Sequence, residues 1–340
     1  MNAEDQKNKD LIMGNKNQRN KPKKIITDNE DINNNLLGNP FENNNNDENI
    51  QNNKVHNILE SNNNDNYNVD NSDENDKEKY INQIKKVYDK SPKLNIEILN
   101  SYIIPRGFII QIDPLGMISN SLRNVRDGTV YFGFYSPEDE NSKEENENNK
   151  IDFLIKPKDD HYESRFIGKH FQIKFNPYDL KYYIKDLGFG YGTFAKIMKE
   201  TLIKDNYLIN IGNSYIVCSY GIDERESNNE KKILNIKIFD NTKRNPFLCN
   251  PNENKKYLIG RDMKCDIIID DSLLSRIHCT IYYNNEKEMW FIHDGTMKKN
   301  KDGEFKYSTN GTWLFLIDDT LIDNDMIFKA NQNLYQCKYE

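Results

Sequence analysis

The sequence repeats itself, and this repeat limits what the chain can fold into more than any other feature does. Residues 201–220, TLIKDNYLINIGNSYIVCSY, recur 119 positions later as TLIDNDMIFKANQNLYQCKY, with Thr, Leu, Ile, Cys and Tyr in register. Further upstream the offset is 108, which relates His170 to His278 and Asp186 to Asp294. Self-similarity at a fixed spacing is the signature of a duplicated structural unit. The sequence therefore predicts two copies of one domain.

The change of offset from 108 to 119 indicates an insertion of 11 residues in the second copy. It lies between Asp294 and Ser308, near residues 296–307, and it is polar and carries two glycines. Such a segment predicts a surface loop rather than an added core element. Its lysines either add positive charge beside a neighbouring binding site or only solvate the loop, and both interpretations stay open. They are Lys298, Lys299 and Lys301.

Both copies are patterned as short β-strands. In the second copy Leu234 and Ile236 alternate with polar residues, and further short apolar runs follow between turn signals. Many short strands separated by turns predict an antiparallel sandwich of about 100 residues. The predicted fold class is all-β, with two tandem antiparallel β-sandwiches at 95–221 and 231–340, joined by the polar linker 222–230.

The N-terminal residues 1–93 differ in composition from the rest. They are dominated by Asn, Asp, Glu and Lys, with hardly any aromatic residues. Such a segment cannot bury enough apolar surface to offset the entropy of ordering the chain, so it is predicted to be a disordered, Asn-rich tail. One short helix is predicted at 76–90, because Tyr80, Ile84 and Val87 fall on one helical face.

The whole-chain composition narrows the class of protein. The net charge of −7 does not favour a nucleic-acid partner, and neither a charged-then-apolar leader nor a run of eighteen apolar residues is present. The five cysteines form no C-x-x-C pair, which favours reduced thiols over disulfides or a metal site; Cys279 fits a buried strand position. Motifs for catalysis or nucleotide phosphates are lacking too. The sequence thus predicts an intracellular protein of the cytoplasm or nucleus, without enzymatic activity, cofactor or metal.

Three short polar or glycine-bearing segments interrupt the strands of the second copy. They are Gly260-Arg261, Ser275-Arg276-Ile277-His278 and Ser308-Thr309-Asn310-Gly311-Thr312-Trp313. Loops gathered at one end of a β-sandwich are a usual place for a binding site. In this order the three segments resemble the forkhead-associated (FHA) domain, a module that reads phosphothreonine in partner proteins. The resemblance implies an FHA/SMAD-like sandwich.

The resemblance also implies a role for individual residues. Those implied to contact the phosphopeptide are Arg261, Ser275, Arg276, Thr309 and Asn310. Those implied to support the loops are Gly260, His278 and Gly311. Arg261 and Ser275 would bond the phosphate, and Arg276 would do so if its side chain or backbone turns inward. Thr309 would line the pocket for the threonine methyl group, and Asn310 would bond the peptide backbone. Taken singly, Asn310-Gly311 also fits an ordinary hairpin turn, and Arg276 also fits a surface charge.

The first copy departs from this pattern at each contact. Gly133-Phe134 stand opposite Gly260-Arg261, Ile167 takes the serine position, and Tyr191 stands where Asn310 should be matched. An apolar residue cannot replace a charged donor against a dianion. The scaffold residues are kept, and they are His170, Gly192 and Thr193. The first copy is therefore predicted to be a degenerate FHA-like sandwich that does not recognise phosphate.

Two functional hypotheses follow. The first is a non-catalytic adaptor whose second copy binds threonine-phosphorylated proteins, with no direct nucleic-acid or membrane partner. The second is a phosphate-independent scaffold in which both sandwiches assemble partner proteins. Thr27, the only threonine before residue 129, is followed by an acid three residues on. In phosphorylated form it is the kind of ligand that the family accepts, so a self-ligand is conceivable.

Overall fold

The structure, a computed structural model, describes residues 73–135, 151–158, 164–221, 232–240, 242, 244–299, 301, 303 and 305–340. Over these ranges the fold is built from β-strands with one α-helix and short 3-10 turns, which confirms the predicted all-β class. Thr27 and the rest of the predicted tail up to residue 72 lie outside the described residues. Among the helices that are described, none has the length and apolar character needed to span a membrane.

The helix α3 (Asp73–Val87) lies where a helix is expected, and the 3-10 turn η1 (Tyr88–Lys90) follows it. Ile84 is fully buried and belongs to the core of the first sandwich, against which Tyr80 and Val87 also pack. The Tyr80 hydroxyl donates a hydrogen bond to the carbonyl oxygen of Phe175. The apolar face read from the sequence is thus the face that attaches the helix to the sheet.

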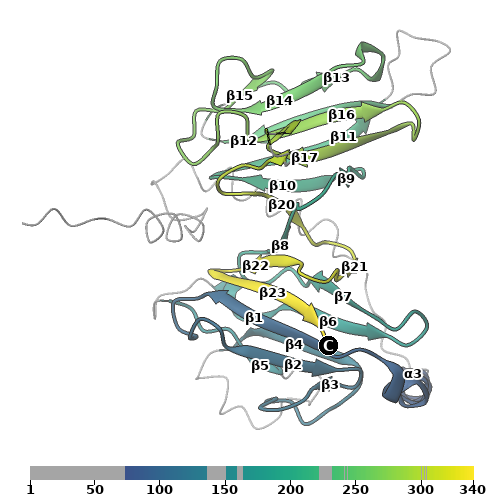
Figure 1. Cartoon of the computed structure of the whole chain (residues 1–340). Coiled ribbons are helices and arrows are strands. Elements are labelled where there is room, and N and C mark those ends of the chain that lie inside the picture. The colour runs from purple at the N-terminus through teal and green to yellow at the C-terminus, as the bar shows by residue number, and fades with distance from the viewer. Residues whose placement is uncertain are drawn as a thin grey trace, which may run out of the picture.

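The strands form two lobes, drawn one above the other in Figure 1. The lower lobe contains strands of residues 95–221, the predicted first copy, and the last three strands of residues 231–340, the predicted second copy. These are β1 (Leu94–Asn100), β2 (Ile109–Asp113), β3 (Gly116–Met117), β4 (Thr129–Phe134), β5 (Phe153–Leu154), β6 (Gly168–Asn176), β7 (Lys181–Asp186) and β8 (Thr193–Lys196), with β21 (Thr320–Leu321), β22 (Ile327–Ala330) and β23 (Asn333–Tyr339). The 3-10 turn η4 (Ser164–Phe166) precedes β6.

The upper lobe contains the last strands of the first copy and most of the second. These are β9 (Thr201–Leu202), β10 (Tyr207–Ile211), β11 (Ser214–Gly221), β12 (Ile233–Phe239), β13 (Phe247–Cys249), β14 (Lys256–Gly260), β15 (Ile267–Ile268), β16 (Cys279–Asn284), β17 (Met289–Asp294) and β20 (Thr312–Phe315). The turn η5 (Pro251–Glu253) precedes β14, and a hairpin of β18 (Thr296–Lys299) and β19 (Phe305–Lys306) lies between β17 and β20.

Each copy gives its last three strands to the other. From the first copy, β9 pairs with β17, β10 with β20 and β11 with β12. From the second copy, β21 pairs with β7, β22 with β8 and β23 with β1. The two cores mix the copies in the same way: Phe328 and Tyr335 pack with Phe171, whereas Ile209 and Ile281 share the other core. The two sandwiches therefore exchange strands within one chain, as in an intramolecular domain swap.

One result of the exchange is that the second sandwich is continuous, from β9 to β20, and is inserted between β8 and β21 of the first. The sequence predicted one sandwich from 95–221 and another from 231–340; the strand pairing groups the residues differently. Equivalent strands share one apolar pattern, so this pattern alone does not choose between the two sandwiches. Strands β11 and β12 are consecutive in sequence and pair directly, which favours the observed grouping.

The lobes meet where β8 pairs with β20, which joins both into one sheet of eleven strands. A small aromatic core lies at this junction, and it consists mainly of Phe194, Tyr215, Trp313 and Phe315 with Leu208. The Lys329 ammonium of β22 donates to the Asn210 side-chain oxygen of β10 at 2.7 Å, which adds a polar bond between the lobes. All five cysteines are buried, and Cys279 lies fully buried in β16, the core position expected for it.

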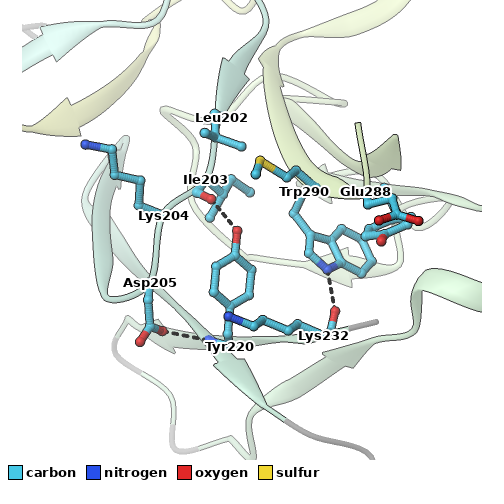
Figure 2. Close-up of a pocket in the computed structure, with 10 residues that line it drawn as sticks. Leu202, Ile203, Lys204, Asp205, Tyr220, Lys232, Glu288 and Trp290 are labelled. Atoms are coloured by element: carbon cyan, nitrogen blue, oxygen red, sulfur yellow. Dashed lines mark hydrogen bonds between the residues drawn. The ribbon is translucent and has the colours of Figure 1, made fainter. Parts of the chain in front are cut away.

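The exchange also creates a cavity of about 410 Å³ in the second sandwich, where strand β9 of the first copy meets β17 of the second. Figure 2 shows Trp290 donating its indole N–H to the Lys232 carbonyl oxygen, at 2.8 Å, and the Tyr220 hydroxyl bonding the Ile203 carbonyl oxygen. The cavity includes Met289, at the start of β17. It therefore lies at the end of that strand opposite to the motif loops described next.

Candidate functional site

The three motif segments lie together at one end of the second sandwich. Strand β14 ends at Gly260, beside the start of the antiparallel strand β16 at Cys279, and the third segment leads into β20. The backbone N–H of Arg261 donates to the Ser275 carbonyl oxygen at 3.3 Å, and that of Asp262 donates to the Arg276 carbonyl oxygen at 3.0 Å. A Cβ atom on Gly260 would stand 2.4 Å from the Arg276 oxygen. Glycine is needed there because the first two loops touch backbone to backbone.

His278 bonds to the second and third loops from inside the fold. Its side chain is fully buried; its Nδ1 accepts a hydrogen bond from the Ser275 backbone N–H at 3.2 Å. Its Nε2, which then carries the proton, donates to the Gly311 carbonyl oxygen at 3.0 Å. Burial lowers the pKa of His278 below its ordinary value, so the ring is neutral at pH 7 and keeps this tautomer. A single uncharged ring therefore fixes the spacing between two loops.

Ser275, Thr309 and Asn310 contact one another's loops directly. The Thr309 backbone N–H donates to Ser275 Oγ at 3.0 Å, while the Asn310 side-chain Nδ2 donates to the Leu273 carbonyl oxygen at 2.8 Å. The Trp313 indole N–H donates to the Asn310 carbonyl oxygen at 2.9 Å. Asn310 therefore uses its amide donor to hold the loops together, which leaves its Oδ1 oxygen available to accept a bond from a ligand.

A buried polar network, which sequence reasoning missed, supports the third loop. Asp294 accepts from the Ser308 hydroxyl at 2.6 Å and from the Thr312 hydroxyl at 2.6 Å. Ser308 Oγ in turn accepts from the Gly311 backbone N–H at 2.9 Å. The repeat had aligned Asp294 with Asp186 of the first copy, and this match was the available signal. The network shows why a carboxylate is useful there: it orders two hydroxyls below the Thr309-Asn310 turn.

Comparison with known proteins bears on these loops. Residues 257–331 match the family model of the FHA domain. The chain carries an FHA domain. Because the matched range begins in β14 and ends just after β22, it crosses from the second sandwich into the first.

A solved structure reported as "Structural and functional analysis of phosphothreonine-dependent FHA domain interactions" also matches. It is 11% identical to this chain, the alignment covers 29% of this chain and 88% of that one, and the TM-score is 0.14. A search of curated proteins gave no match.

Two arginines of the FHA domain are exposed beside the joined loops. Arg261 follows Gly260 directly, and Arg276 lies between Ser275 and the buried His278. Within the described part of the chain, neither guanidinium forms a hydrogen bond or an ion pair. Both positive charges are therefore available to a ligand, and no internal carboxylate has to be displaced to reach them.

The insertion of the FHA domain lies at the surface, as predicted, but it is partly ordered as the β18–β19 hairpin rather than a plain loop. The reason is aromatic packing: His293 stacks on Tyr307, with ring centroids 5.8 Å apart, and meets Phe305 edge-on at 5.0 Å. Lys298 and Lys301 are exposed. The Lys299 ammonium lies 5.3 Å from the centre of the Phe305 ring, so it makes a cation–π interaction within the hairpin.

The equivalent end of the first sandwich is aromatic. Phe134, opposite Arg261, is buried and packs edge-on against Phe166 with centroids 5.6 Å apart, and Phe166 contacts Tyr191 at 5.5 Å. Arg165 lies over the Tyr191 ring at 5.1 Å, a cation that sequence reasoning did not single out. The His170 ring accepts at Nδ1 from Asn331 of the second copy. Aromatic rings therefore pack against one another at this end of the first sandwich.

The described residues give no sign of a metal centre: no three or more His, Cys, Asp or Glu side chains gather so as to hold an ion.

Proposed function

We propose that this protein is a non-catalytic adaptor that binds threonine-phosphorylated proteins through the loop end of its second sandwich. The observation that carries the proposal is the pair of uncommitted guanidinium groups of Arg261 and Arg276, which flank Ser275 on loops held by backbone bonds. A phosphate dianion is bound best by charged donors that converge on it. The match to the FHA family supports phosphothreonine proteins as the class of ligand.

The bonds within the loops suggest how each residue takes part. Ser275 Oγ accepts from the Thr309 backbone N–H at 3.0 Å, and its hydroxyl donates to Thr309 Oγ1 across 3.4 Å. That second bond is long, so the Ser275 proton can be donated to a phosphate oxygen instead. Arg261 supplies a charge-assisted bond, and the exposed Thr309 offers a methyl group beside the phosphorylated side chain. Asn310 Oδ1 is placed to accept a backbone N–H of the peptide. Each of these groups is positioned before ligand arrives, which lowers the entropy cost of binding.

The decisive test is titration of the full-length chain with a phosphothreonine peptide selected from an oriented library. Arg261→Ala should weaken binding by about ten- to a hundredfold, the range expected for removing one charged hydrogen-bond partner. Arg106→Ala is the matched control, because Arg106 is an exposed arginine in the β1–β2 turn, away from these loops. A phosphoserine version of the peptide should bind more weakly, since it lacks the methyl group.

The phosphate-independent scaffold predicts a different outcome of the same titration. Binding of a partner would then be unaffected by dephosphorylation of that partner or by Arg261→Ala. Either result would replace the proposal with the scaffold hypothesis. A peptide that contains phosphorylated Thr27 belongs in the series, because its binding would point to a self-ligand.

A further inference from the structure

Lys196 lies beside the phosphopeptide loops although it belongs to the first copy. It is the last residue of β8 and pairs with Trp313 of β20. A Cβ atom built on Gly311 would stand 2.9 Å from Lys196 Cε and 3.2 Å from Trp313 Nε1. Gly311 has no side chain and adopts a φ of 80°, so the end of the lysine side chain rests against the turn that carries Asn310.

The ammonium group of Lys196 has no partner among the described residues, either by hydrogen bond, ion pair or ring contact. Its neighbours along the chain and across the sheet differ in this respect. Lys199 pairs with Asp323 at 2.5 Å, and Lys329 bonds Asn210 and lies over the Trp313 ring. Lys196 is only half-buried. It is thus a cation held at a defined place and available to an outside anion.

The strand exchange is what brings Lys196 to this place. Strand β20 has β10 on one side and β8 on the other, and both come from the first copy. Residue 196 is therefore outside the 257–331 range that matches the FHA domain. Sequence comparison within that range would not find it.

We propose that Lys196 is a further peptide-binding residue, which selects a ligand with an acidic side chain close to the phosphothreonine. This rests on the proposed function, since it needs a phosphopeptide on the same loops. The phosphate is assigned to Arg261 and Ser275, and Asn310 to the peptide backbone. Gly311 follows Asn310, and the Lys196 side chain reaches Gly311 with its Cε atom. A peptide bound at Asn310 would therefore bring its neighbouring side chains close to this lysine.

The expected gain is that of a partly exposed ion pair. Such pairs contribute about 0.2–1 kcal/mol, which corresponds to a preference of up to about fivefold for an acidic over a neutral residue. The preference should shrink as salt is added, because screening acts on exposed charges. A residue that selects in this way changes specificity more than overall affinity.

The experiment is an oriented phosphothreonine peptide library applied to the full-length protein, followed by titration of the selected peptide and of its versions with Ala or Lys at the selected acidic position. The wild type should enrich Asp or Glu at one position near the phosphothreonine. Lys196→Ala should lose that enrichment while it binds the Ala peptide as the wild type does, and Lys196→Glu should favour Lys or Arg there. Lys181→Ala, an exposed lysine at the start of β7, should behave as wild type.

The outcomes are separable. If Lys196→Ala weakens all phosphopeptides equally, Lys196 contacts the phosphate or supports the loops, and the proposed selectivity is wrong. The same conclusion follows if wild type and Lys196→Ala enrich the same residues. If the library gives no phosphate-dependent binding with any variant, the proposed function itself fails, and the inference about Lys196 fails with it.

Discussion

The backbone N–H of Asn213 donates a hydrogen bond to the side-chain oxygen Oδ2 of Asp271 at 2.8 Å. Asn213 lies in the β10–β11 turn of the first copy, and Asp271 begins the turn that leads to Ser275 in the second. Asp271 also accepts from the Leu273 backbone N–H at 2.8 Å through its other oxygen. One carboxylate thus fixes a loop of the proposed binding site to a turn supplied by the other copy.

Gly212 gives a direct test of this support. A Cβ atom there would stand 2.4 Å from Asp271 Oδ2, which can move only by giving up its bond to Asn213. Gly212→Ala should lower the melting temperature and raise the dissociation constant of a phosphothreonine peptide, measured by calorimetry. Gly107→Ala is the control, because Gly107 also has a positive φ but a Cβ atom there would have no neighbour within 4 Å. Equal effects of both variants would show that backbone strain alone is responsible.

Cutting the chain between the copies should not separate them. A protease site placed within 222–230 lies between β11 and β12, and after cleavage each fragment still contributes three strands to the other fragment's sandwich. We expect the fragments to elute together in native size exclusion and to separate only in denaturant. Two closed sandwiches, each made from one copy, would separate without denaturant unless a stable interface holds them. Recovery of free fragments would contradict the observed pairing.

His170 should make stability depend on pH below neutrality. Burial lowers its pKa from 6.5 to about 4, so the unfolded chain takes up a proton in this interval while the folded chain does not. Stability from this group is present above pH 6.5 and is lost as the pH falls toward 4, by at most about 3 kcal/mol. His170→Gln should show a smaller fall over that interval in denaturant titrations and a profile parallel to wild type above pH 7. If the difference in unfolding free energy between wild type and His170→Gln were the same at every pH, this linkage would be ruled out.

The first sandwich should bind no phosphopeptide of its own. Phe134 is buried against Phe166 where a phosphate arginine would be needed, so one peptide should bind per chain. Arg261→Ala should then weaken all phosphate-dependent binding by about ten- to a hundredfold and leave no second, unaffected site, and isothermal titration measures the stoichiometry. Phe134→Arg is expected to destabilise the protein by about 3 kcal/mol rather than create a second site, because it removes a buried ring. Two peptides per wild-type chain would contradict this.

Much of the local structure could be predicted from the sequence. The alternating apolar runs predicted the strands, and the spacing of Tyr80 and Ile84 predicted the buried face of the helix. The glycine-bearing segments predicted the loops of the FHA domain. These features depend on residues close to one another in the chain, and short-range patterns carry that information. The position of His278 beneath the loops followed from resemblance, and the structure adds the bonds that it makes.

The strand exchange could not be predicted, for a physical reason. The segments 201–220 and 320–339 carry the same apolar pattern, so hydrophobic matching alone does not decide which sandwich each completes. The choice depends on loop lengths and on the packing of Trp313 and Phe194 at the junction. Lys196 and Asp271 were missed for the same reason, since both act across the boundary between the copies.

The inserted arrangement of the second sandwich sets an order for synthesis. Strands β1 to β8 leave the ribosome before the inner unit, yet β23, which pairs with β1 and contributes Tyr335 to that core, is made after it. The inner unit has all its strands once residue 315 has emerged, so it can close while the outer unit is still open. A chain that stopped shortly after residue 315 would therefore keep the loops that carry Arg261, Ser275 and Asn310. It would leave the first sandwich without β21, β22 and β23, so the apolar interior of that sandwich would be exposed.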